Sequence, residues 1–254
     1  MSQTIAISGK GGSGKTTLAG LIVRALVERA SGSVLAVDAD PNACLASTLG
    51  VEVETTVGDI RDDALERKLQ TGPGMDRERA VEYAIQRAVV EANGFDLLAM
   101  GHTEGPKCYC AVNHLLRKYL DRAATDYPWL VLDNEAGMEH LSRRTTDAVD
   151  LLVVVAEPTP IGAQTARRIL GLAERLPVTI RRSGVIWNKV SDPTRLEPLA
   201  AGLPTMARVP FDPQILEASM AGTPVFRLPA DCAALETVGN ALAQALGIEL
   251  AQPS

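Results

Sequence analysis

The sequence predicts an α/β protein with a doubly wound, mainly parallel sheet and helices on both faces. The first observation is a series of short apolar runs bounded by turn residues along the 254-residue chain. The second is that helical periodicity follows these runs, as at Thr16–Arg29 and Ala163–Arg175. The third is the Leu-Leu-Val-Val-Val run at 151–155, which is typical of a strand covered on both faces. In such a fold, ligands bind at the carboxyl ends of the strands.

Six apolar runs are predicted to be strands. They are Thr4–Ser8, Val34–Asp38, Phe95–Met100, Trp129–Asp133, Leu151–Ala156 and Val185–Asn188. Further helices are expected at Val112–Ala124 and at 233–250. Residues 52–94 are mainly polar and helical in pattern, with a Gly-Pro-Gly break at 72–74. We therefore expect a single domain over residues 1–254, with a helical excursion at about 52–94.

The charge and hydropathy of the chain disfavour nucleic acid and membrane as partners. The formal net charge is −6, whereas proteins that bind nucleic acid usually carry a basic patch. No apolar run approaches the roughly 20 residues of a membrane span. The first apolar run leads directly into a glycine-rich loop, without a secretory signal. The apolar helix at 233–250 carries Glu236 and Glu249 but no basic face, unlike a membrane-surface anchor. A cytoplasmic location is expected.

The glycine-rich loop from Gly9 to Thr17 predicts a nucleotide site. It reads Gly-Lys-Gly-Gly-Ser-Gly-Lys-Thr-Thr and joins a predicted strand to a predicted helix. Glycines let the backbone N–H groups wrap phosphate oxygens, and the helix N-terminus adds a positive dipole. Lys15 is expected to hold the β- and γ-phosphates, and the Thr16 hydroxyl to bind Mg²⁺. The nucleotide-binding residues expected here are Gly11, Gly12, Ser13, Gly14, Lys15, Thr16 and Thr17.

Carboxylates end two of the predicted strands. Asp38 and Asp40 face the phosphate loop, where they can order Mg²⁺-bound water and the attacking water. The alternative is that Asp-Pro-Asn at 40–42 only forms a turn. Another apolar strand ends in Asp133, with Gly137 four residues later, which is the Walker B and switch II pattern. Asp133 is expected to contact Mg²⁺ through water, and the Gly137 N–H to move towards the γ-phosphate.

Lys10 gives the phosphate loop a second lysine. With it, the loop resembles that of the deviant-Walker ATPases, which include MinD, ParA, nitrogenase iron protein and metal-centre maturation ATPases. The resemblance implies a homodimer in which Lys10 reaches the partner subunit's nucleotide. It also identifies Asp40 as the water-positioning aspartate of switch I, supported by Asp38. Lys10, Lys15 and Asp40 are thus the expected catalytic residues.

Asn188 and Lys189 end another predicted strand and resemble the base-binding position of this family. A guanine-specific site usually places an acid three residues after the asparagine, but this chain has Ser191 there. Adenine is therefore expected, bound by Asn188, by Lys189 and by the backbone near Pro210, within the Pro-Phe-Asp segment 210–212. The expected cofactors of the core are ATP and Mg²⁺.

Cys108 and Cys110 form a Cys-x-Cys pair before a predicted helix and beside Lys107. Such surroundings lower thiol pKa values, which suits metal binding. Two cysteines supply half of a four-thiolate site, so a two-fold dimer would complete it. The alternative is a pair that is buried or redox-active without metal.

The segment around this pair resembles the CooC family of nickel-insertion ATPases for carbon monoxide dehydrogenase and acetyl-CoA synthase. The matching residues are the Cys-x-Cys segment, Met100-Gly101 before it and the segment 133–140. The resemblance implies that Cys108 and Cys110 bind Ni²⁺, or Zn²⁺, at the dimer interface. The client is then carbon monoxide dehydrogenase or a related nickel enzyme. The alternatives are a positioning ATPase of the MinD/ParA type and an iron–sulfur reductase or scaffold.

Overall fold

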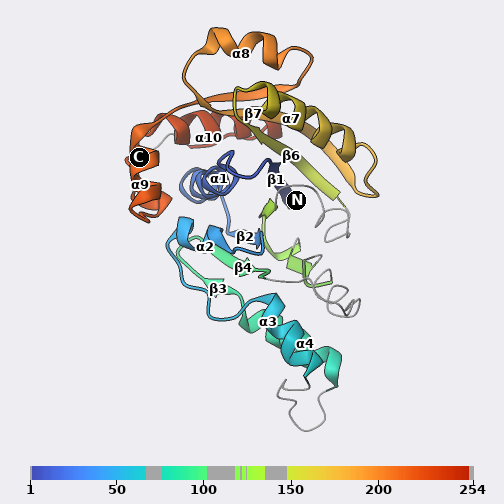
Figure 1. The fold of residues 1–254 in the computed structure, drawn as a ribbon. Helices are drawn as coiled ribbons and strands as arrows, with labels where there is room; N and C mark the ends of the chain where they lie inside the picture. Colours follow the sequence, from blue (N-terminus) through green and yellow to red (C-terminus); the bar gives the residue numbers. More distant parts are fainter. Residues whose placement is uncertain are drawn as a thin grey trace.

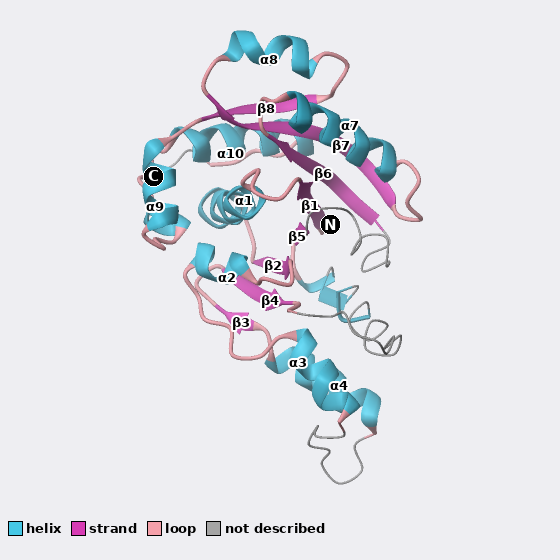
Figure 2. Ribbon diagram, in the orientation of Figure 1, coloured by secondary structure: helices cyan, strands magenta, loops and turns pink. Residues whose placement is uncertain are grey.

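The computed structural model describes residues 2–66, 76–101, 118–120, 122–123, 125–134 and 148–251. In this part of the chain, eight strands form one sheet in the order β3-β4-β2-β5-β1-β6-β7-β8 (Figures 1 and 2). All neighbouring pairs are parallel except β3 with β4. The doubly wound α/β fold is therefore confirmed. The strands are β1 (Gln3–Gly9), β2 (Val34–Ala39), β3 (Val90–Glu91), β4 (Phe95–Ala99), β5 (Trp129–Asn134), β6 (Ala148–Ala156), β7 (Thr179–Val190) and β8 (Thr205–Pro210).

Helices cover both faces of the sheet. The described helices are α1 (Lys15–Arg29), α2 (Cys44–Leu49), α3 (Val57–Leu65), α4 (Arg77–Arg87), α7 (Pro160–Ala173), α8 (Pro193–Ala200), α9 (Pro213–Met220) and α10 (Ala233–Leu246), with a 3₁₀ turn at Val225–Arg227. One hydrophobic core joins α1, α2 and α10 to the sheet, and the other joins α3, α4 and α7 to the opposite face. Figure 1 shows α1 and α10 together, with α7 on the other side of the strands.

Side-chain alternation along the strands produces the two cores. In β1, Ile5 and Ile7 lie in the core with α1, whereas Ala6 lies in the other core. In β6, Val153 and Val154 likewise belong to opposite cores. Both faces of each central strand are apolar because helices cover both faces.

The structure extends the sequence prediction at several elements. All six predicted strands are present, but β3 and β8 were not predicted. β3 has only two residues, and β8 is an edge strand with mostly half-exposed or exposed residues. The predicted helix 163–175 begins earlier, at Pro160, because Thr159 caps it by accepting from the Gly162 N–H. Of the predicted helix at 112–124, residues 118–120 and 122–123 are described and helical.

The predicted excursion at 52–94 contains α3, α4 and the short strand β3. A capping box starts α3, in which Thr56 and Asp59 bond reciprocally. Asp76 caps α4 by accepting from the Arg79 N–H. No helix in the described residues is long and apolar enough to cross a membrane.

Candidate nucleotide-binding site

The loop between β1 and α1 lies at the carboxyl ends of the central strands. Gly9 ends β1 with a φ of 158°, and a Cβ there would lie 2.4 Å from the Val155 carbonyl oxygen. Gly14 precedes α1 with a φ of 91°, and a Cβ there would lie 2.3 Å from Nδ2 of Asn188. No side chain caps this helix end. The first N–H groups of α1 therefore remain available for an anion.

The two lysines of the loop differ in their surroundings. Lys15 is buried, and its Nζ lies 3.5 Å from the Lys10 carbonyl oxygen. The N–H and hydroxyl of Ser13 donate to the same oxygen, at 3.2 and 2.8 Å. The Lys10 side chain is exposed and has no hydrogen-bond or ion-pair partner among the described residues. Lys15 thus points into the loop, whereas the Lys10 ammonium is free to reach another molecule.

Asp133 lies beside the loop with its carboxylate buried and without a hydrogen-bond partner. It is 1% exposed, and neither Oδ1 nor Oδ2 has a partner with good geometry within the described chain. Burial raises the pKa of Asp133 from 3.8 to about 7, while the nearby Thr16 hydroxyl and Lys15 ammonium oppose this rise. A buried carboxylate without partners next to a hydroxyl suits a hard cation such as Mg²⁺. The residues present therefore fit Mg²⁺ held by Thr16 and, through water, Asp133.

Asp38 is buried, and both of its carboxylate oxygens accept backbone hydrogen bonds. Its Oδ2 accepts from the Leu45 N–H at 2.7 Å, and its Oδ1 accepts from the Asp40 N–H at 3.2 Å. Burial raises its pKa to about 6, although these two backbone hydrogen bonds lower it. Both oxygens are therefore engaged in holding the segment between β2 and α2. The structure shows Asp38 organising this segment, and its expected Mg²⁺ contact remains a prediction.

Asp40 forms the turn that was its alternative interpretation. Its Oδ1 accepts from the N–H and Nδ2 of Asn42, at 2.9 and 2.8 Å. Its carbonyl oxygen accepts from the N–H of Ala43, which has a φ of 48°. Asp40 also lines the cavity next to the glycine loop. Turn formation and a place facing a bound nucleotide are thus compatible.

A cavity of about 470 Å³ extends from the glycine loop towards β8 and α9. Its lining brings together most of the predicted nucleotide-binding residues: Gly11, Gly12, Gly14, Lys15, Thr16, Thr17, Asp40, Asn188, Lys189 and Pro210. Phe211 and Leu216 also line it, and both are nearly half exposed. An aromatic and an aliphatic side chain at this position provide an apolar surface for a base.

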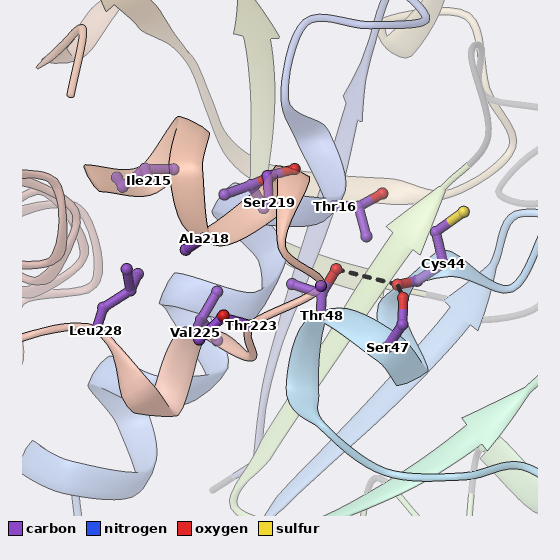
Figure 3. A pocket seen from close by; sticks show the side chains of 12 residues that line it. Thr16, Cys44, Ser47, Thr48, Ile215, Ala218, Ser219, Thr223, Val225 and Leu228 are labelled. Carbon is purple, nitrogen blue, oxygen red and sulfur yellow. Dashed lines mark hydrogen bonds between the residues drawn. The ribbon is translucent and has the colours of Figure 1, made fainter. Parts of the chain in front are cut away.

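A smaller cavity of about 260 Å³ adjoins the first and shares Thr16, Thr17, Ile215 and Ser219 with it. Figure 3 shows Thr16 and Cys44 on one side of this cavity and the side chains of α9 on the other. The Cys44 thiol is exposed. The part of the thiol that is shielded from solvent still raises its pKa, and the charges of Asp38, Asp40 and Asp133 raise it further. Its apolar neighbours in the sequence predict a buried small residue at this position, and that prediction is wrong.

Asn188 and Lys189 bind the glycine loop itself. Nδ2 of Asn188 donates to the Ser13 carbonyl oxygen at 2.9 Å, and Nζ of Lys189 donates to the Gly12 carbonyl oxygen at 3.0 Å. Lys189 also pairs with Glu157 at 2.7 Å. These contacts were not predicted, because they join residues about 175 positions apart and depend on the order of the strands. Contact of Asn188 or Lys189 with a base remains a prediction.

Three predicted site residues, Cys108, Cys110 and Gly137, lie outside the described residues. Within the part of the chain that the structure describes, no group of three or more His, Cys, Asp or Glu side chains could hold a metal ion.

The chain is similar to known nucleotide-binding proteins. The family model described as "CobQ/CobB/MinD/ParA nucleotide binding domain" matches residues 4–225. An uncharacterized ATP-binding protein of Methanocaldococcus jannaschii is 42% identical over 233 residues, which are 89% of this chain and 91% of that protein. The carbon monoxide dehydrogenase accessory protein CooC of Rhodospirillum rubrum is 36% identical over 242 residues, covering 90% and 91% of the two chains.

A solved structure shows the same fold. The septum site-determining protein MinD of Pyrococcus horikoshii, complexed with Mg-ADP, superposes with a TM-score of 0.68 at 21% identity. The match covers 96% of each chain. At this level of identity the match shows the shared architecture only.

Proposed function

Because the chain belongs to the CobQ/CobB/MinD/ParA nucleotide-binding family, we propose that it is a dimerising ATPase that delivers a metal ion to an enzyme. ATP is hydrolysed to ADP and phosphate. Cys108 and Cys110 of two subunits bind Ni²⁺, or Zn²⁺, and hydrolysis assists its insertion into carbon monoxide dehydrogenase or a related nickel enzyme. We place this activity in the cytoplasm, where thiols stay reduced. The CooC protein that is 36% identical along nine-tenths of this chain supports the client.

The observation that carries the ATPase part is the carboxylate of Asp133. It is buried without a hydrogen-bond partner beside Thr16 and Lys15, at the carboxyl end of β5. When bound there, Mg²⁺ would neutralise charge on the phosphates. Lys15 binds the β- and γ-phosphates, and the first N–H groups of α1 orient them. Asp40, at the rim of the cavity, positions the attacking water. Catalysis by these groups is positioning and charge stabilisation.

The exposed ammonium of Lys10 supports dimerisation. A buried or paired lysine could not reach a second subunit, whereas the described structure leaves this side chain without a partner. In the proposed dimer, Lys10 approaches the nucleotide of the partner subunit and stabilises charge that develops during hydrolysis. ATP thereby draws two Cys-x-Cys pairs together, and hydrolysis releases them.

The metal part is tested by equilibrium dialysis against Ni²⁺ and against Zn²⁺ under reducing conditions, with light scattering on the same samples. The variants are Cys108→Ala/Cys110→Ala and the matched control Cys44→Ala/Cys232→Ala, which removes the other two cysteines. We expect one ion per dimer in the parent and the control, and none in the Cys108/Cys110 variant. Equal metal content in all three proteins would contradict the shared thiolate site.

The same proteins decide between the proposed function and its alternatives. A brown, oxygen-sensitive parent after anaerobic isolation would indicate an iron–sulfur reductase or scaffold. Salt-sensitive binding to DNA or anionic vesicles in the presence of ATP would indicate a positioning ATPase. Loss of metal without loss of ATP hydrolysis in the Cys108/Cys110 variant would support a metal-delivery ATPase.

A further inference from the structure

Lys189 adopts a backbone conformation that lysine rarely has. Its φ is 59°, and Ala43 is the one other described non-glycine residue with a positive φ. The residue lies in a β-bulge, because β7 advances from Trp187 to Val190 while β8 advances only from Arg208 to Pro210. A left-handed lysine costs roughly 1–2 kcal/mol. Such strain persists where a structure needs the side chain in a particular direction, and bulges next to active sites redirect side chains.

The bulge directs two consecutive side chains onto one loop. In a regular strand, Asn188 and Lys189 would point to opposite faces of the sheet. Here Nδ2 of Asn188 binds the Ser13 carbonyl oxygen, and Nζ of Lys189 binds the Gly12 carbonyl oxygen. Two neighbouring carbonyl groups of the phosphate loop are thus held from the same strand end.

Holding these carbonyl groups also orients N–H groups. A trans peptide is planar, so its N–H points opposite to its C=O. Fixing the carbonyls of Gly12 and Ser13 towards β7 therefore directs the N–H groups of Ser13 and Gly14 away from β7, across the loop. The Ser13 N–H donates to the Lys10 carbonyl oxygen at 3.2 Å and so closes the loop on itself, whereas the Gly14 N–H is among those expected to bind phosphate.

Glu157, the residue that follows β6, completes this arrangement. Its Oε1 lies 2.7 Å from Nζ of Lys189, and both side chains are partly exposed. The backbone of Glu157 is itself fixed, because its carbonyl oxygen accepts from the Thr159 N–H at 2.7 Å. A Cβ on Gly162 would lie 2.2 Å from the same oxygen, so α7 packs tightly against this turn. Without Glu157, the ammonium could leave Gly12 for water.

We propose that Glu157 is a positioning residue for nucleotide binding: it holds Lys189 on the Gly12 carbonyl and thereby keeps the phosphate loop in its binding conformation. The inference rests on the nucleotide site of the proposed function. A surface ion pair that only adds stability would affect unfolding and not nucleotide binding. The positioning role predicts instead that nucleotide affinity and stability respond separately to substitution.

The test measures the Kd for Mg-ADP by calorimetry, and the urea midpoint of unfolding, on the full chain. Glu157→Gln keeps the shape but removes the charge, and we expect a roughly 3- to 10-fold weaker Kd. Lys189→Gly suits the left-handed conformation, so its urea midpoint should stay equal or rise. It should nevertheless bind Mg-ADP roughly tenfold more weakly, because the ammonium is lost.

The matched control is Glu197→Gln. Glu197 pairs with Arg208 on the surface at 2.9 Å and does not line the cavity. We expect its Kd to equal that of the parent. A charge swap, Glu157→Lys/Lys189→Glu, restores an ion pair, but a carboxylate at position 189 cannot donate to the Gly12 carbonyl. The swap should therefore remain weak in Mg-ADP binding.

The outcomes distinguish a failure of the positioning role from a failure of the proposed function. Parent-like affinity in Glu157→Gln, or rescue by the charge swap, would overturn the positioning role while leaving the nucleotide site intact. Absence of Mg-ADP binding by the parent itself would contradict the proposed function, and the positioning role with it.

Discussion

Asp38 and Asp133 are paired in register on the neighbouring strands β2 and β5, yet only one of them has its charge compensated by hydrogen bonds. Asp38 accepts two backbone N–H groups, whereas both oxygens of Asp133 are buried without a partner. Burial raises both pKa values, that of Asp133 to about 7 and that of Asp38 to about 6, and the two backbone hydrogen bonds to Asp38 oppose the rise there. The carboxylate without partners is the one that the Walker B pattern assigns to Mg²⁺.

This difference predicts a pH-dependent effect of Asp133→Asn on the nucleotide-free protein. The pKa of Asp133 rises from 3.8 in the unfolded chain to about 7 in the folded protein. Its contribution to stability is therefore fully present below pH 3.8 and is lost as the pH rises through 7. Asparagine does not ionise, so the variant should gain on the order of 2 kcal/mol more over the parent at pH 8 than at pH 5.

The measurement is the free energy of unfolding in urea at both pH values, without nucleotide or Mg²⁺. Asp63→Asn, on the exposed side of α3, serves as the control and should show the same difference from the parent at pH 5 and at pH 8. An equal gain in stability for Asp133→Asn at the two pH values would show that folding does not raise the pKa of the Asp133 carboxyl group.

Alanine should have opposite effects on stability at two glycines, one at the phosphate loop and one inside an ordinary helix. Gly14→Ala places a Cβ 2.3 Å from Nδ2 of Asn188 at a φ of 91° and should reduce stability by roughly 1–3 kcal/mol. Gly171 lies in α7 with open space around its Cβ position. Gly171→Ala should therefore add about 1 kcal/mol.

Thermal unfolding of the two variants, together with Mg-ADP titration, checks this contrast. Only Gly14→Ala should weaken Mg-ADP binding. Tolerance of alanine at both positions would mean that the contact between Gly14 and Asn188 is loose in solution.

Because Lys10 is exposed, we expect its substitution to affect dimerisation but not folding. Lys10→Ala removes no side-chain hydrogen bond or ion pair among the described residues, so its stability should stay within about 0.5 kcal/mol of the parent. ATP-dependent dimerisation, measured by light scattering, should be lost. Lys15→Ala should lose both ATP-dependent dimerisation and Mg-ADP binding. A Lys10→Ala protein that still dimerises with ATP would exclude a role for this lysine between subunits.

Cys44 provides a probe of the charges around the site. Its pKa is raised by burial and by three carboxylates, including Asp40. Asp40→Asn keeps an oxygen for the turn but removes one charge, so more thiolate forms at pH 8. In protein lacking Cys108 and Cys110, alkylation of Cys44 should become roughly two- to threefold faster. Mass spectrometry follows the rate, and an unchanged rate would place Asp40 outside the reach of the thiol.

The sequence predicts features whose residues are adjacent in the chain. The phosphate loop is one, because glycines, lysine and threonine in one short segment define both its conformation and its chemistry. The central strands are another, because burial on both faces makes them continuously apolar, as at 151–155. β8 and the first half of β7 were not predicted, because they are partly exposed and therefore carry polar residues such as Arg181 and Arg182.

Long-range partners were not predictable from the sequence alone. Glu157, Lys189 and Gly12 meet only because β6, β7 and the loop after β1 become neighbours in the sheet. The strained φ of Lys189 likewise has no signal in the residue type. Conversely, the assignments of Cys108, Cys110 and Gly137 rest on the sequence and stay predictions.

The position of β1 in the sheet has a consequence for synthesis of the chain. β1 pairs with β5 and β6, so Gln3 has Trp129 as its partner and Ile5 has Leu151. A ribosome must therefore release more than half of the polypeptide before its first strand gains either neighbour. Until then the glycine loop has no rigid support, and the residues near Pro210 that close the cavity emerge later still. A nascent chain thus cannot retain nucleotide early, and such late, non-local pairing makes folding slow.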